Sequence, residues 1–242
     1  DIHGGGMDLK FPHHDCEIAQ SEAVYNQNPA NFWIHTNMLT LNGKKMSKSS
    51  NNFILPENLF NGNSELIEKG FKPMVVKFLM YQAHYRNTLD LSNESLLAAE
   101  KGYKKLVESF SDIDNLQPSK NENIEYESII KKCYDSMLDD FNSPKLISHL
   151  FEISRIIDNV KKKKNFMSKK SINELKNYMQ VFLVDILGFS IDDDENEKIE
   201  ECNKLINTIL EIRNFSRKNK NYEMSDLIRE KLNSLGIKIE DS

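Results

Sequence analysis

A histidine and a glutamate four residues apart are the first side chains in this sequence whose types and spacing could do chemistry. They are His13 and Glu17, which follow Pro12 and the three glycines Gly4–Gly6. Residues four apart share one face of a helix, so this imidazole and carboxylate suit two ligands of one zinc ion. The same pattern also fits a glutamate that pairs with a protonated histidine. Spacing alone leaves both interpretations open, because a zinc site takes roughly three or four protein ligands.

A second group of polar side chains lies in the pentapeptide Lys45–Ser49, which follows the turn-forming pair Asn42-Gly43. Its two lysines and two serine hydroxyls could close over a polyphosphate and neutralise the charge that develops on a leaving pyrophosphate. The high lysine content of the chain favours the simpler interpretation of an exposed basic loop. Lysine density alone therefore does not identify a nucleotide site.

The elements that must position these groups change in character along the chain. Six of the nine glycines and four of the six prolines precede residue 75, which predicts a loop-rich part of an α/β domain. Asp1–His3 is typical of the end of a buried strand that runs into a glycine loop. Further on, apolar residues recur at intervals of three and four, as they do on the buried face of a helix. These faces predict an antiparallel helical bundle, followed by a helical pair at about 195–218 and 223–235.

The composition of the 242 residues excludes several classes of protein. No apolar run approaches the ~20 residues of a membrane-spanning helix, and no basic-then-apolar leader opens the sequence. Three cysteines argue against a disulfide framework and for a cytoplasmic protein. A net charge of −5 argues against binding nucleic acid through a uniformly basic surface, although local basic patches remain open.

Taken together, the motifs resemble the cysteinyl-tRNA synthetase family. Lys45–Ser49 reads KMSKS, the signature of class I aminoacyl-tRNA synthetases. The stretches DIHGGGMDL at 1–9 and FPHHDCEIAQ at 11–20 resemble that family closely. So do AHYR at 83–86 and DDFNSP at 139–144, and the final helical pair resembles the family's terminal tRNA-binding helices. The resemblance spans essentially the whole chain, with its motifs in the family's order.

The resemblance implies a zinc site for the substrate cysteine. His13 and Glu17 would bind one zinc ion per subunit, which holds the thiolate of cysteine, and His3 would face the amino-acid pocket. A metal that binds a soft sulfur would select cysteine over serine and alanine, which cannot supply one. Two further zinc ligands are expected from the family's first half. Cys16 stands where the family often has asparagine, and we interpret it as a packing change.

The resemblance also implies where ATP, bound with Mg²⁺, would lie. Lys48 would contact ATP as the second lysine of the KMSKS loop. The remaining candidates for the phosphates and the adenylate are Lys45, Ser47, Ser49, Gly4, Gly5 and Asp8. Asp8 would accept hydrogen bonds from the ribose hydroxyls, although a carboxylate after a glycine loop also suits a helix cap.

For tRNA(Cys), the resemblance points to the helical tail. Its candidate contacts are Arg213, Arg217, Lys218 and Arg229. A solvated helix face is the simpler interpretation for each of them. A steep dependence of tRNA binding on salt would support contact with phosphates.

We therefore predict a mainly α protein that is the C-terminal half of a cysteinyl-tRNA synthetase. The C-terminal part of a Rossmann-like α/β catalytic domain occupies 1–55, and a connecting helical segment occupies 56–95. A tRNA-binding antiparallel helical bundle at 96–190 and anticodon-binding helices at 195–242 follow. The family's nucleotide-binding HIGH segment and two cysteine ligands of zinc are absent, so this chain is expected to be inactive alone. We also expect a monomer in the cytoplasm, with no membrane contact.

Two alternatives differ in the acceptor or in the activity. A related ligase joins cysteine to an amino-sugar and shares the front motifs, but it lacks the terminal helices and departs from the glutamate ligand, whereas Glu17 and residues 195–242 are present here. A non-catalytic tRNA-binding module would keep the front motifs only as relics. The intact Lys45–Ser49 argues against that reading.

Overall fold

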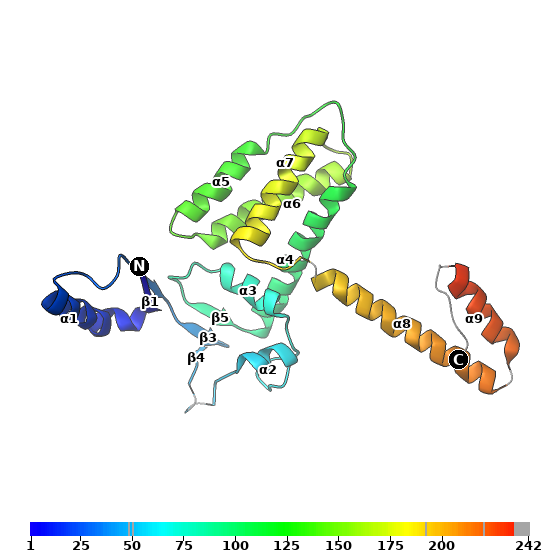
Figure 1. Ribbon diagram of the computed structural model, residues 1–242, viewed down its shortest axis with the longest axis horizontal. Coiled ribbons are helices and arrows are strands. Elements are labelled where there is room, and N and C mark those ends of the chain that lie inside the picture. Colours follow the sequence, from blue (N-terminus) through cyan, green and yellow to red (C-terminus); the bar gives the residue numbers. More distant parts are fainter. Residues whose placement is uncertain (48, 50, 192, 220, 235–242) are drawn as a thin grey trace. The chain divides into compact units, whose positions relative to one another are not determined.

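The computed structural model describes residues 1–47, 49, 51–191, 193–219 and 221–234 (Figure 1). It divides into two compact units, residues 1–189 and 190–242. The sequence-based divisions at residues 55 and 95 lie inside the first unit, so they stay predictions. Among the described residues, no helix is both long and apolar enough to cross a membrane.

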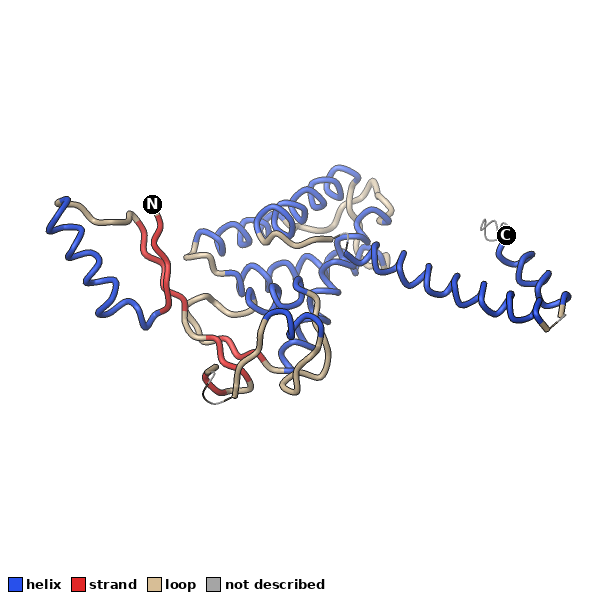
Figure 2. Tube along the Cα trace, turned by 60° about the horizontal axis from the view of Figure 1, so that its bottom comes forward, coloured by secondary structure: helices blue, strands red, loops and turns tan. Residues whose placement is uncertain are grey.

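The chain opens with a parallel strand pair. β1 (Ile2–Gly6) pairs with β2 (Phe32–Thr36), and α1 (Asp15–Tyr25) lies in the connection between them (Figure 2). Parallel neighbours need such a crossover, and the β–α–β unit is the building block of Rossmann-like domains. The three glycines extend β1 and do not form the predicted loop. Glycine by itself is unfavourable in a strand. Here the extended backbone of the three glycines is hydrogen-bonded to β2.

A second small sheet follows, in the order β4–β3–β5. β3 (Leu39–Leu41) pairs with β4 (Lys44–Lys45) in antiparallel fashion and with β5 (Leu89–Leu91) in parallel fashion. The turn from β3 to β4 is Asn42-Gly43, and both residues have the positive φ that a tight hairpin turn needs, 52° and 72°. The turn predicted from this dipeptide is therefore present. The helices α2 (Pro56–Asn61) and α3 (Pro73–Tyr81) lie between β4 and β5 in the sequence.

The predicted helical bundle makes up the rest of the first unit (Figure 1). It consists of α4 (Asn93–Asp112), α5 (Glu127–Leu138), α6 (Ser143–Lys161) and α7 (Lys169–Gln180). The apolar faces seen in the sequence meet in its core, where the most deeply buried side chains include Leu96, Leu106, Leu146, Leu150, Ile153 and Ile157. The prediction of a mainly α protein is confirmed.

The second unit is a pair of helices, α8 (Asp193–Lys218) and α9 (Tyr222–Ser234), that contact each other. Both lie close to the ranges expected from the sequence. The glycine stop predicted at Gly236 lies outside the described residues.

Candidate functional site

Glu17 contacts two histidines from different segments. Its Oε1 lies 3.1 Å from His13 Nε2, and its Oε2 lies 3.1 Å from His3 Nε2. His13 belongs to the helical turn Lys10–His14, which precedes α1. Within this turn the backbone is non-helical only at Phe11, so the helical stretch that runs into α1 begins at Pro12. The spacing of four brings His13 and Glu17 together, since the turn Lys10–His14 continues into α1.

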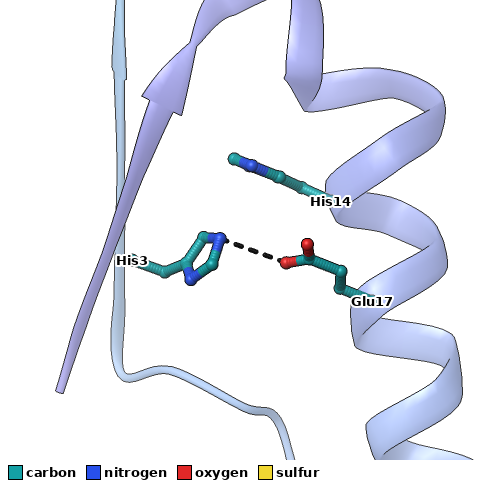
Figure 3. A group of neighbouring side chains, drawn as sticks. All are labelled: His3, His14 and Glu17. Carbon is teal, nitrogen blue, oxygen red and sulfur yellow. Dashed lines mark ion pairs between the residues drawn. The ribbon is translucent and has the colours of Figure 1, made fainter.

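A buried histidine joins this group. One ligand atom from each of His3, His14 and Glu17 lies within 4.8 Å of the others, so these three side chains could converge on one metal ion. Figure 3 shows His3 reaching from β1 toward Glu17 while His14 comes from the helix side. Imidazole nitrogen and carboxylate oxygen are donors that zinc accepts. His14 was not among the residues predicted from the sequence, although it stands next to His13.

His14 is held from several sides. It is only 3% exposed, and its Nδ1 lies 2.9 Å from His35 Nε2, a hydrogen bond in which one ring donates and the other accepts. Its ring centre lies 4.7 Å from that of His3 and 5.1 Å from that of Trp33. Burial lowers the pKa of His14, which favours the neutral imidazole. Trp33 and His35 alternate with Ile34 on β2 and so share one face of the strand.

The absence of a side chain at Gly5 makes room for His14. A Cβ placed on Gly5 would lie 2.7 Å from His14 Cε1 and 3.1 Å from Nε2. At Gly4 the nearest atom to such a Cβ is Ile34 O at 3.8 Å. The group that approaches Gly5 is thus an imidazole of the chain itself. Asp8 is exposed in the turn Met7–Leu9.

The KMSKS segment follows β4. Lys45 is the last residue of that strand and is exposed. Ser47 pairs with Asn52 across the loop, and the hydroxyls of Ser47 and Ser49 lie 3.1 Å apart. Asn52 Nδ2 donates to three backbone oxygens at 3.2 to 3.3 Å, those of Leu41, Lys44 and Lys45. Lys48, the residue predicted to contact ATP, lies outside the described residues.

The four cations predicted to contact tRNA differ in exposure. Arg217, Lys218 and Arg229 are exposed on α8 and α9. Arg213 is only 5% exposed, so it does not belong to a cationic edge on the surface of this helical pair. The sequence could not separate the four, because helical spacing alone does not say which turn of α8 faces α9.

Comparison with known proteins decides the family. Residues 1–101 match the domain family described as "tRNA synthetases class I (C) catalytic domain", and residues 132–192 match the family described as "DALR domain". The cysteine–tRNA ligase of Parabacteroides distasonis is 42% identical over 243 residues, which cover 100% of this chain and 50% of that protein. The cysteine–tRNA ligase of Phocaeicola vulgatus is 43% identical over 245 residues, with the same coverage. The chain belongs to the cysteine–tRNA ligase family.

This member of the cysteine–tRNA ligase family spans about half the length of the curated relatives it matches. The family resemblance seen in the sequence motifs is therefore confirmed. One solved structure is similar in fold, and its low sequence identity supports no conclusion beyond the fold. The LeuRS of Agrobacterium radiobacter K84, determined in a ternary complex with tRNA and LeuAMS, has a TM-score of 0.53 and 14% identity over 76% of this chain and 25% of its own.

Proposed function

We propose that this chain is the C-terminal half of a cysteine–tRNA ligase, which activates cysteine with ATP and transfers it to the 3′ end of tRNA(Cys). The observation that carries the proposal is the contact of Glu17 with both His13 and His3, within a chain matched along 100% of its length by cysteine–tRNA ligases. The proposed protein is a cytoplasmic monomer. Because the proposed site needs residues from both halves of the ligase, the 242-residue chain alone is expected to be inactive.

The donors at Glu17 suit a zinc ion. The family resemblance assigns the zinc to His13 and Glu17, in place of the group His3, His14 and Glu17, and two further ligands would come from the half of the protein that this chain does not include. When bound, zinc would stabilise the thiolate of cysteine and so distinguish cysteine from serine. His3, which contacts the same carboxylate, would form one wall of the amino-acid pocket. His14, which is buried and hydrogen-bonded to His35, would pack against His3 and hold it in place.

Charge stabilisation, and not acid–base chemistry, is the proposed contribution of the KMSKS segment. Lys48 would contact the ATP phosphates, and Lys45 with the hydroxyls of Ser47 and Ser49 would assist it. Positive charge placed where pyrophosphate leaves lowers the barrier because negative charge builds up there. Gly4, Gly5 and Asp8 would lie near the adenylate. The tRNA would be held by the helical bundle and by the exposed cations Arg217, Lys218 and Arg229.

The test uses the full-length ligase and two assays. Cysteine-dependent exchange of ATP with pyrophosphate measures activation, and charging of tRNA(Cys) measures transfer. Lys48→Ala is expected to slow exchange at least ~100-fold, the scale seen on loss of one charge stabiliser. Exchange at the wild-type rate in this variant would contradict the assignment of Lys48. Charging of an amino-sugar in place of tRNA would point to the related ligase.

Elemental analysis tests the metal site independently of activity. His13→Ala is expected to lose zinc and to bind cysteine more weakly. His149→Ala is the matched control, because His149 also pairs with a glutamate, Glu152, at 3.1 Å but lies in the bundle. Unchanged zinc in His13→Ala would contradict the proposed ligand, and equal loss in both variants would indicate a general effect on folding.

A further inference from the structure

Two sequence motifs that the proposed function leaves without a role meet in the first unit. They are residues 83–86, between α3 and β5, and residues 139–144, at the turn from α5 to α6. The carboxylate of Asp140 joins them. Its Oδ1 accepts a hydrogen bond from Tyr85 Oη at 2.7 Å, and its Oδ2 lies 2.9 Å from Arg86 Nη2. We call Tyr85, Arg86 and Asp140 the Asp140 junction.

His84 reinforces the junction. Its Nε2 donates to the backbone oxygen of Asp140 at 3.1 Å, and its Nδ1 accepts the backbone N–H of Arg86 at 3.2 Å. A neutral imidazole protonated on Nε2 satisfies both contacts. The ring also stacks on Tyr85, with centres 4.7 Å apart and planes at 27°. Two side chains of the first motif and one backbone group of the second are thereby fixed together.

The guanidinium of Arg86 is bonded twice within the junction. Arg86 Nε donates to Tyr85 Oη at 3.2 Å while Nη2 pairs with the carboxylate of Asp140. The hydrogen bond with Tyr85 and the charge of Asp140 both raise the pKa of Arg86, so the side chain stays a cation. Hydrogen bonds between charged partners are stronger than neutral ones, which makes this carboxylate the main attachment point.

The backbone at this turn is unfavourable without such contacts. Asp140 and Phe141 both have positive φ, 53° and 54°, a region that residues other than glycine rarely occupy. The neighbouring Asp139 accepts hydrogen bonds from Lys145 Nζ at 2.8 Å and from Asn142 Nδ2 at 3.2 Å, both at the start of α6. The two adjacent aspartates therefore differ in their hydrogen-bond partners. Asp139 stabilises the turn, and Asp140 connects the turn to the motif at 83–86.

The same motif is attached to a strand of the candidate site. Asn37 follows β2, and its Nδ2 donates to the backbone oxygen of Arg86 at 2.9 Å. The backbone N–H of Asn37 donates to the backbone oxygen of Tyr85, also at 2.9 Å. Two residues earlier, His35 on β2 is hydrogen-bonded to His14. Residues 85 and 86 thus bond to the end of β2 on one side and to the turn from α5 to α6 on the other.

We propose that the Asp140 junction is a positioning element that fixes the turn from α5 to α6 relative to β2, so that a tRNA held by the bundle presents its 3′ end to the site. This inference rests on the proposed function. Within this chain, activation of cysteine involves the residues around β1, β2 and the KMSKS segment, and it does not involve the tRNA. Transfer also needs the tRNA to be placed correctly, and a small displacement at such a step lowers its rate strongly. The junction residues act through placement and not through contact with the reacting atoms.

The experiment separates the two steps in the full-length ligase. Asp140→Asn keeps the shape of the side chain but removes the charge that pairs with Arg86. We expect it to lower kcat/KM for tRNA(Cys) charging at least about tenfold, the scale of one charge-assisted hydrogen bond, while ATP–pyrophosphate exchange changes less than about twofold. Tyr85→Phe removes one hydroxyl and leaves the ion pair, so a smaller loss in the same direction is expected. Asp139→Asn is the matched control, with both activities within about twofold of wild type.

Each outcome bears on the inference. An equal fall in exchange and charging for Asp140→Asn would overturn it, because that pattern indicates a general structural role. Unchanged charging in both Asp140→Asn and Tyr85→Phe would overturn it as well. Tyr85→Phe gives the same readout if Asp140→Asn does not fold. Absence of cysteine-dependent exchange in the wild-type ligase would instead contradict the proposed function itself.

Discussion

Replacing Gly5 with alanine is expected to displace the imidazole of His14 and to destabilise the β1–α1–β2 segment. The new Cβ would lie 2.7 Å from His14 Cε1, roughly 0.7 Å closer than the 3.4 Å at which ordinary contact begins. His14 cannot move away easily, because it is bonded to His35 and packed against Trp33. Overpacking of this kind costs about 1–3 kcal/mol.

Gly4→Ala is the control that isolates this clash. Its Cβ would meet no atom closer than Ile34 O at 3.8 Å, and neither glycine has a positive φ that would strain an alanine. Both substitutions restrict the unfolded chain equally, which stabilises the folded state by about 0.4–1 kcal/mol where no clash occurs. Gly5→Ala is therefore expected to be less stable than Gly4→Ala by about 1–3 kcal/mol.

Urea denaturation followed by tryptophan fluorescence measures this difference. Trp33 is the single tryptophan of the chain, and its ring lies 5.1 Å from that of His14, so the signal comes from the site itself. A shift in the midpoint at constant slope would report a change in stability. Equal midpoints for the two alanine variants would refute the reasoning, because they would mean that His14 does not occupy the space beside Gly5.

Two further predictions concern the bundle and the cysteines. Burial raises the pKa of the Cys133 thiol to about 12, so at pH 8 iodoacetamide is expected to modify the exposed Cys16 and to leave Cys133 intact in the folded protein, as read by peptide mass mapping. Rapid modification of Cys133 without denaturant would contradict its burial. Leu150→Ala is expected to lower the free energy of unfolding by about 2–5 kcal/mol, because Leu150 is fully buried. Leu138→Ala, at a position 84% exposed, is expected to change it by about 0.5 kcal/mol or less in the same urea titration.

Local patterns in the sequence predicted the parts of the protein that depend on short-range geometry. The spacing of His13 and Glu17 led directly to their contact, because the turn of a helix brings such residues together. Apolar periodicity predicted the bundle and the helical pair α8–α9 for the same reason. Asn42-Gly43 predicted its turn, since few residue pairs accept two positive φ angles.

Those local patterns could not predict contacts between residues that are far apart in the sequence. The group around His14 depends on the parallel register of β1 with β2, which places His3 opposite Trp33, and no local rule gives that register. The glycines of β1 point to a loop by propensity, and only the partner strand makes them extended. The bond between Tyr85 and Asp140 joins residues 55 apart, so the sequence indicated both motifs without indicating that they meet.

The side chains gathered around Glu17 all lie between residues 3 and 35 of the sequence. They are the imidazoles of His3, His13, His14 and His35 and the carboxylate of Glu17. They come from a single β–α–β unit, so only short loops must close before these donors are near one another, and the entropy lost in closing them is small. These side chains can therefore come together before the bundle has left the ribosome. They also lie within one continuous segment of the sequence, so that segment can be transferred as a unit into another parallel-sheet scaffold.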